Sequence, residues 1–280
     1  MVTRSWQATG GSVRGALHVR HGIPNQDAVL WNPPTGAAGF AATAVADGHG
    51  SNRCFRSKTG ARIAVEVGLT LMSQLMSQAD SDRSAAGREQ LSRRLAAAWM
   101  EAVSSDLDNE PFSDQELRRL EEAEGPEARQ EVLEGPALAY GTTLLLAGAD
   151  DREVVVLQVG DGDILTVSAG GLVTRPLPPD PRAVGNATAS LARPSAWRDA
   201  RTRCLPADAE GPALVLAATD GYANSFEDDA GFLQVGSDLL AIIRANGLEE
   251  VNAQLEGWLG EVSELGSGDD VSVGMLVASG

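Results

Sequence analysis

The chain is poor in cysteine, in histidine and in positive charge. Among its 280 residues it has two cysteines, Cys54 and Cys204, which lie far apart and in no CxxC pattern. This spacing excludes a cysteine-ligated zinc site and a disulfide framework. Three histidines leave almost no material for a multi-histidine zinc centre. Any metal chemistry must therefore depend on carboxylates.

Long apolar runs are also missing. No run approaches the roughly 18 residues that a membrane-spanning helix needs. The N-terminal stretch MVTRSWQATGGSV has no apolar segment of the kind found in secretory signals. Together with the two isolated cysteines, these features predict a cytoplasmic protein without a membrane partner.

The charge balance is strongly acidic, because 39 Asp and Glu residues outnumber 22 Lys and Arg residues and leave a net charge of −17. Such a field repels nucleic-acid phosphates and anionic lipids, so the composition disfavours both as partners. Most of these carboxylates are expected on the solvated surface. The question is whether a few of them converge on a cation.

Apolar residues make up 43% of the chain, which is enough for a sizeable core. Short β-rich runs bounded by glycine predict strands, and longer runs with apolar residues at i, i+3 and i+4 predict helices. The predicted strands are 40–46, 142–147, 154–159, 164–167, 214–218 and 271–277, and the predicted helices are 56–78, 85–107, 232–246 and 248–262. This order favours a layered α/β (α+β) sandwich with mainly antiparallel sheets. Since no linker or repeat is visible, we predict one domain, 1–280.

Two segments stand apart from this pattern. Residues 113–134 are highly charged and interrupted by Gly125-Pro126, which fits either a partner-binding arm or, as we favour, a solvated surface helix pair. Residues 177–203 are rich in Pro, Ala and Arg without clear periodicity. This segment is longer than most connections, which is typical of a flap over a binding site.

Several apolar runs are flanked by aspartate. Three predicted strands end in an Asp-Gly pair and two more aspartates border other apolar runs; the five residues are Asp27, Asp47, Asp161, Asp220 and Asp269. Any single Asp-Gly pair is usually a turn. If the strands are neighbours, however, these side chains gather at one edge, where closely spaced carboxylates need a counter-charge. An all-oxygen set of ligands favours Mg²⁺ or Mn²⁺.

Six motifs in order carry a family resemblance. GIPNQDA, VADGHG, YGTTLLLAG, VGDG, ATDGY and GDDVSV resemble the metal-dependent protein phosphatases of type 2C, in a bacterial branch whose first motif reads Pro-Asn-Gln-Asp. The match extends from about Gly11 to Val277. It implies a four-layer αββα sandwich with two central antiparallel sheets and a two-metal site at one sheet edge.

The resemblance also implies a role for each aspartate. Asp47 would bridge two Mn²⁺ or Mg²⁺ ions, and the carbonyl of Gly48 would bind one of them. Asp220 and Asp269 would complete the shell of the other ion, and Asp161 would belong to a weaker third metal position. Two residues are implied to be catalytic: Asp27 would orient metal-bound water, and His49 would act as the general acid.

The implied activity is hydrolysis of phosphoserine and phosphothreonine by in-line attack of a metal-activated water on phosphorus. Such an enzyme needs no cysteine or serine nucleophile. Its partners would be a phosphoprotein substrate and, by analogy with bacterial signalling, a cognate serine/threonine kinase or the targets of that kinase.

The chain departs from the family pattern at several positions. Gln26 stands where a glutamate is usual, and Gly22 stands where an arginine usually grips the substrate phosphate. Among the arginines that could replace it (Arg20, Arg14 and Arg53), we favour Arg20. Asn224 replaces a further acid, which weakens the third metal position, and Asp163 replaces the arginine that often ends the VGDG motif.

These departures keep alternatives open. The chain could be a catalytically degenerate relative that binds a phosphoprotein as a regulatory module, or a hydrolase of small phosphoesters. Against degeneration, Asp27, Asp47, Asp220 and Asp269 are all retained. An active phosphatase is therefore the favoured hypothesis.

Overall fold

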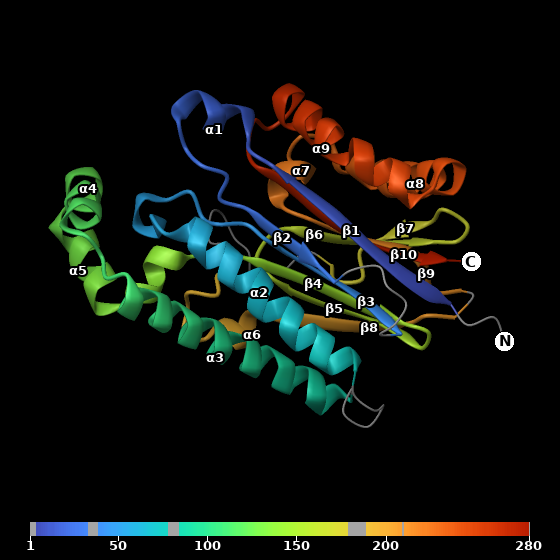
Figure 1. Cartoon of the computed structure of the whole chain (residues 1–280), viewed down its shortest axis with the longest axis horizontal. Helices are drawn as coiled ribbons and strands as arrows, with labels where there is room; N and C mark the ends of the chain where they lie inside the picture. Colours follow the sequence, from blue (N-terminus) through green and yellow to red (C-terminus); the bar gives the residue numbers. More distant parts are fainter. Residues whose placement is uncertain (1–3, 33–38, 78–83, 179–188, 209, 280) are drawn as a thin grey trace.

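Two five-stranded antiparallel sheets stack face to face, and helices cover both outer faces (Figure 1). This architecture comes from a computed structural model, which describes residues 4–32, 39–77, 84–178, 189–208 and 210–279. It is the four-layer sandwich that the motifs imply. No helix in these ranges is both long enough and apolar enough to cross a membrane.

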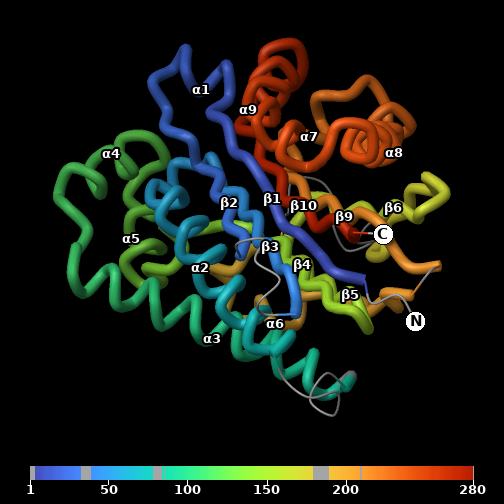
Figure 2. Tube along the Cα trace, turned by 45° about the vertical axis from the view of Figure 1, so that its right-hand side comes forward, coloured from blue at the N-terminus to red at the C-terminus, as the bar shows by residue number. Residues whose placement is uncertain are grey.

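The first sheet has the strand order β1-β10-β9-β6-β7. Its strands are β1 (Ser5–Val13), β6 (Asp163–Ser168), β7 (Val173–Thr174), β9 (Pro212–Ala218) and β10 (Val271–Ser279). β1 and β10 pair along their whole length, from Ser5 opposite Ser279 to Val13 opposite Val271. The first and last strands of the chain therefore lie side by side, as Figure 2 shows.

The second sheet has the order β2-β3-β4-β5-β8. Its strands are β2 (Ala28–Trp31), β3 (Phe40–Ala46), β4 (Leu144–Asp150), β5 (Glu153–Val159) and β8 (Arg201–Pro206). β3, β4 and β5 are almost entirely buried, because helices cover one face and the first sheet covers the other. This explains why they read as continuous apolar runs rather than as alternating patterns.

Long helices cover each sheet. α2 (Ser57–Met76) and α3 (Ala85–Asn109) lie over the second sheet, while α8 (Asp229–Asn246) and α9 (Leu248–Leu265) lie over the first (Figure 1). The apolar side chains of α2 recur at helical spacing, and Ile63, Leu71 and Leu75 are buried. One apolar layer lies between each sheet and its helices. A third lies between the two sheets and includes Val45 and Leu276.

The four long helices and six strands that the sequence predicts are all present, most with shifted ends. Strands β1, β2, β7 and β8 are additions. β1 reads SWQATGGSV, whose glycines and polar residues hide its strand character. Gly10 is required there, because a Cβ would lie 2.7 Å from the carbonyl oxygen of Val273 on β10. The pairing partner, which is distant in sequence, therefore makes this segment a strand.

Residues 113–134 form a helix pair, α4 (Asp114–Glu124) and α5 (Pro126–Glu134). Ser113 and Glu116 form a capping box at the start of α4. The pair is not wholly solvated, because Leu117, Leu120, Ala128 and Val132 are buried. Its charged residues thus surround a narrow apolar stripe.

The predicted flap, 177–203, lies partly outside the described residues, which omit 179–188. Its described part contains the short helix α6 (Ala196–Asp199) and the beginning of β8.

The remaining short elements are α1 (Ala16–His21), η1 (Asn52–Cys54), η3 (Pro136–Tyr140) and α7 (Asp220–Ala223). α1 carries His18 and α7 carries Asp220, and both residues belong to the candidate functional site.

Candidate functional site

A cavity of about 470 Å³ is lined by residues from the ends of strands in both sheets. Asp47 follows β3, Asp161 lies between β5 and β6, Asp220 begins α7 just after β9, and Asp269 precedes β10. His49 lines the same cavity. Five of the residues predicted from the sequence therefore share one cavity, although their strands belong to two different sheets.

The loop that carries Asp47 is held by the YGTT segment. The backbone N–H of Thr143 donates to the Asp47 carbonyl at 2.8 Å, and the Thr142 hydroxyl donates to the same oxygen at 2.8 Å. In return, the Asp47 N–H donates to the Thr143 hydroxyl at 3.0 Å. The YGTT motif thus fixes the backbone from which the Asp47 side chain projects.

Gly48 is buried where three segments meet. A Cβ at this position would lie 2.6 Å from the carbonyl oxygen of Gln26 and 2.9 Å from the backbone of Ser57. Only glycine therefore allows this close approach of backbones. The same approach brings Gln26, next to Asp27, against the Asp47 loop.

Among the described residues, the cavity brings together four carboxylates and a single arginine, Arg193. Burial raises the pKa of Asp47 well above its usual value, and the nearby charges of Asp27 and Asp220 raise it further. Burial also raises the pKa of Asp220, although a hydrogen bond with Asp47 opposes the shift. Such a group of carboxylates stays fully ionised only with a counter-charge. Its all-oxygen donors fit Mn²⁺ or Mg²⁺.

Asp27 lies beside this group without lining the cavity. Its side chain is buried, and its Oδ2 accepts a hydrogen bond from the Thr219 hydroxyl at 2.9 Å. Burial raises its pKa well above the usual value, followed by the charge of Asp270. Asp27 is close enough to Asp47 for its charge to raise the pKa of that carboxyl.

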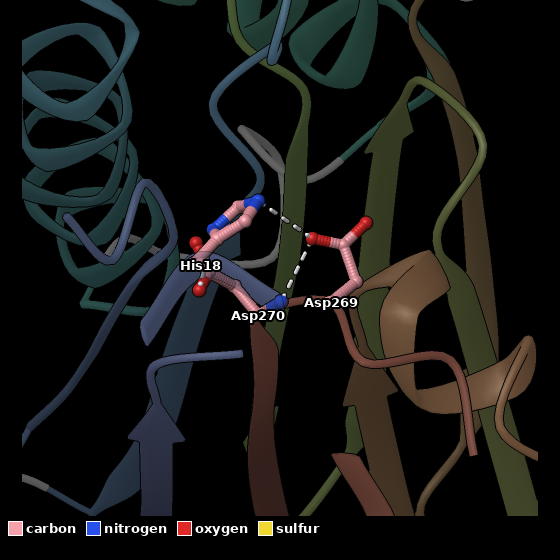
Figure 3. Close-up of side chains that lie close together, drawn as sticks. All are labelled: His18, Asp269 and Asp270. Atoms are coloured by element: carbon pink, nitrogen blue, oxygen red, sulfur yellow. Dashed lines mark hydrogen bonds and ion pairs between the residues drawn. The ribbon is translucent and has the colours of Figure 1, made fainter. Parts of the chain in front are cut away.

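Asp269 is anchored by two residues that the sequence did not single out for the site (Figure 3). Nε2 of His18, on α1, lies 3.4 Å from Asp269 Oδ1, and His18 Nδ1 lies 2.9 Å from Asp270 Oδ1. Buried Asp270 also accepts hydrogen bonds from the backbone N–H groups of Gly15 and Gln26, at 2.7 and 2.6 Å. The second aspartate of GDDVSV thus ties three segments together.

His18, Asp269 and Asp270 form a group with metal-ligand character. One ligand atom from each residue lies within 4.8 Å of the others. Asp269 belongs both to this group and to the cavity wall. The repeated acid in GDDVSV is a sequence signal for Asp270, whereas His18 stands in no motif that marks it.

His49 lines the cavity beside Gly141. Its backbone N–H donates to the Gly141 carbonyl at 3.0 Å, which fixes the turn. Burial lowers the pKa of the imidazole, Asp161 opposes this, and Arg193 adds to it. Within the described residues, His49 Nε2 is buried without a hydrogen-bond partner. This nitrogen is therefore available to a ligand in the cavity.

The predicted phosphate-binding arginine, Arg20, does not line the cavity. It is exposed on α1, where its Nε donates to the Ala16 carbonyl at 3.2 Å. Arg14 donates to the His18 carbonyl, and Arg53 pairs with Glu124 and Glu131. The arginine that lines the cavity is Arg193. Sequence reasoning missed it because it lies in an aperiodic segment.

Two departures from the motifs have structural explanations. The Asn224 side chain donates to Asp220 Oδ2 at 3.2 Å, so it contacts the site as a neutral residue. Asp163 pairs with Arg175, which also pairs with Asp229 at the start of α8. Asp163 therefore anchors a helix to the sheet.

The fold and the sequence were compared with known proteins. The crystal structure of the catalytic domain of the serine/threonine protein phosphatase PstP with two manganese ions has a TM-score of 0.59 and 14% identity, over 99% of this chain and 100% of that one. PppA, a regulatory component of the T6SS in Pseudomonas aeruginosa, has a TM-score of 0.56 and 16% identity, over 98% of both chains. A C. elegans sex-determining protein has a TM-score of 0.54 and 19% identity, over 98% of this chain and 65% of that one.

These likenesses, all below 25% identity, establish the fold. A search of curated protein sequences gave no match. The family model for protein phosphatase 2C matches residues 14–260, which include the Asp-Gly motifs of the cavity. The chain belongs to the protein phosphatase 2C family.

Proposed function

We propose that the protein is a Mn²⁺- or Mg²⁺-dependent serine/threonine protein phosphatase. The observation that carries this proposal is the convergence of Asp47, Asp161, Asp220 and Asp269 on one cavity. The raised pKa values of Asp47 and Asp220 support it, because they mark carboxylates that lack a counter-charge. A purely structural cluster would be expected to include balancing cations.

The proposed ligands are Asp47 and the Gly48 carbonyl for one ion, with Asp47, Asp220 and Asp269 for the other. Asp161 would belong to a weak third position. Two divalent cations held by these residues would supply the counter-charge of the carboxylates and lower the pKa of a water, so that hydroxide would be available for in-line attack on phosphorus near pH 7. The hydrogen bonds from Thr142 and Thr143 keep the Asp47 backbone in place before any ligand binds.

Two residues are proposed to move or hold protons. Asp27 has a raised pKa and a fixed hydrogen bond from Thr219, so it can orient a water or accept a proton next to Asp47. His49 lines the cavity with an Nε2 that has no hydrogen-bond partner among the described residues, and the protonated imidazole would give a proton to the departing serine or threonine oxygen. Arg20, although exposed on α1, remains the sequence-based candidate for binding substrate.

The proposed substrate is a phosphoprotein, and the partners are a cognate serine/threonine kinase or the targets of that kinase. The support is by likeness: PstP is a serine/threonine protein phosphatase, and PppA is a regulatory component of a secretion system. The composition, without long apolar runs and with two isolated cysteines, favours a cytoplasmic location.

Hydrolysis of an aryl phosphate and of a phosphothreonine peptide tests the proposal, with Mn²⁺, Mg²⁺ or EDTA present. We expect turnover that requires the metal and that Asp220→Ala abolishes. Asp108→Ala, at an exposed position on α3, is the matched control and should leave turnover unchanged. Turnover that survives EDTA would refute the metal mechanism.

A second candidate function is a degenerate, phosphoprotein-binding module. The observation that favours it is Gln26, whose neutral side-chain amide donates to the buried Ser57 hydroxyl at 2.8 Å, where an acid would add charge to the site. Under this alternative, neither substrate is turned over, and the phosphothreonine peptide still binds in calorimetry. The two functions are thus separated by one pair of measurements.

A further inference from the structure

Four carboxylates and one cationic side chain are among the described residues that line the cavity. Asp47, Asp161, Asp220 and Asp269 provide negative charge. Among the described lining residues, Arg193 is the sole lysine or arginine. No hydrogen bond or ion pair joins its guanidinium to another residue in the part of the chain that the structure describes. An uncommitted arginine facing an acidic metal site is placed to meet a ligand that carries both metal-binding oxygens and negative charge.

The backbone around Arg193 is tied to the same segment that holds Asp47. Leu191 N–H donates to the Thr142 carbonyl at 2.9 Å, and the Arg193 N–H donates to the Ser190 carbonyl at 3.2 Å. Thr142 in turn donates to the Asp47 carbonyl. Thr142 therefore connects the backbone of the Arg193 segment to the loop that carries Asp47.

The other arginines that the sequence offered for phosphate binding do not line the cavity, and each bonds to another group. Arg53 bonds Glu124 at 2.7 Å and Glu131 at 2.6 Å. Arg20 and Arg14 bond backbone carbonyls on α1. Arg193 also lies close enough to His49 for its charge to reach the imidazole. Among the described residues, the Arg193 guanidinium and His49 Nε2 have no hydrogen-bond partner, and both residues line the cavity with the carboxylates.

We propose that Arg193 binds the phosphate group of the substrate, in the role for which the first motif has no arginine at Gly22. The ligand class is a phosphomonoester dianion. Its non-bridging oxygens would face the metal side and the guanidinium fork at once, because a planar fork matches two phosphate oxygens. This inference rests on the proposed phosphatase function, since it names the substrate-binding residue of that site.

Three variants test the role of Arg193: Arg193→Gln, Arg193→Lys and, for comparison, Arg20→Gln. For Arg193→Gln we expect KM for the phosphothreonine peptide and the inhibition constant of inorganic phosphate to rise about 10- to 100-fold, since charge-assisted hydrogen bonds of roughly 1.5–3 kcal/mol are lost. The value of kcat should change less, because the contact exists before the reaction. Arg193→Lys should recover part of the loss.

Controls separate phosphate binding from a structural role. Mn²⁺ affinity, measured by calorimetry, should be the same in wild type and Arg193→Gln. Arg198→Gln, in the neighbouring helix α6, should change none of the constants. Unchanged KM and phosphate inhibition in Arg193→Gln, or the full effect in Arg20→Gln instead, would overturn the inference and leave the phosphatase function intact.

The inference remains testable if the wild type hydrolyses neither substrate. In that case the phosphatase proposal fails, and binding of inorganic phosphate and of the phosphothreonine peptide is measured by calorimetry with Mn²⁺ present. Weaker binding by about 10-fold or more in Arg193→Gln would support phosphate recognition by Arg193. Equal binding in both proteins, or no binding to the wild type, would overturn it.

Discussion

At the residue scale, the site places negative charges where they oppose folding. Asp27, Asp47 and Asp220 all have pKa values raised mainly by burial, so their ionised forms are disfavoured in the metal-free protein. Hydrogen bonds from Thr219 to Asp27 and from Asn224 to Asp220 offset only part of this cost. Function and stability therefore compete at these positions.

Asp47→Asn tests this competition. The amide keeps the size of the side chain and removes one negative charge from the group of carboxylates. Without metal, the free energy of unfolding of the variant should therefore be about 1 kcal/mol higher than that of wild type. Phosphatase activity should fall by more than about 100-fold, because a proposed bridging ligand is lost. Urea denaturation with EDTA present and a turnover assay with Mn²⁺ measure the two effects. A variant that is less stable than wild type would contradict the electrostatic argument.

At the element scale, the charged helix pair is joined to the core by a buried arginine. Arg56, which precedes α2, donates to both carboxylate oxygens of Glu116 on α4, at 2.8 and 3.1 Å, and to the Tyr140 hydroxyl at 2.8 Å. Burial alone would raise the pKa of Glu116, but the hydrogen bonds from Arg56 and Ser113 lower it to about 2. The pair α4 and α5 is therefore a docked part of the fold.

Glu116→Gln should lower the free energy of unfolding at pH 7 by about 2 kcal/mol. The folded pKa lies below the ordinary value of 4.5, so the contribution is present above pH 4.5 and is lost as the pH falls toward 2. The difference between wild type and variant should thus shrink across that window. Denaturation curves at several pH values measure it. Glu122→Gln, exposed on the same helix, is the control, and an equal effect there would refute the role of Arg56.

Helix α2 also crosses η3 at very short range. Gly60 allows this crossing, because a Cβ there would lie 1.9 Å from the Tyr140 carbonyl oxygen. The same residue accepts a hydrogen bond from the indole of buried Trp99 at 3.1 Å. The position of η3 matters to the site, since the following Gly141 carbonyl holds the His49 backbone.

A pair of glycine-to-alanine variants tests this crossing. Gly60→Ala should destabilise the protein by about 3 kcal/mol, because two backbones must move apart. Gly257→Ala, in the interior of α9 with nothing within 4 Å of the new Cβ, should instead stabilise it by roughly 0.5–1 kcal/mol. Thermal or urea unfolding measures both. A neutral Gly60→Ala would show that α2 and η3 can separate without cost.

At the scale of the whole molecule, the two sheets bring together groups that no single sheet contains. Asp161 lies in the connection between a strand of each sheet, β5 and β6. Asp47 follows a strand of the second sheet, and Asp220 and Asp269 flank strands of the first. Their mutual repulsion acts between the halves of the sandwich. A cation bound among them would join the two sheets, so metal binding and global stability should be linked.

Mn²⁺ should therefore raise the free energy of unfolding of the wild type, by about 2.7 kcal/mol per site at a free concentration near 100 times Kd. Asp220→Ala should lose most of this gain, and KCl of equal ionic strength should reproduce little of it, because screening is not site binding. Denaturation curves with and without Mn²⁺ measure the gain. Equal gains in wild type and Asp220→Ala would place the ion elsewhere.

Most of the long helices and central strands could be predicted from local sequence patterns. Helical periodicity located α2, α3, α8 and α9, and buried apolar runs located the central strands, because both patterns depend on near neighbours in the chain. These local patterns did not predict the polar, glycine-containing β1 or the short β2, because pairing with other strands makes these segments strands. The aspartates were visible because each interrupts an apolar run.

The sequence alone determined the family, the layered class and the identity of the candidate acids, because these are carried by residue types in a fixed order. Tertiary structure decided which residues meet. It brought His18 and Asp270 to Asp269, placed Arg193 rather than Arg20 in the cavity wall, and brought Asp27 near Asp47. These contacts join segments up to hundreds of residues apart, and the stacking of two sheets creates them, which no local pattern encodes.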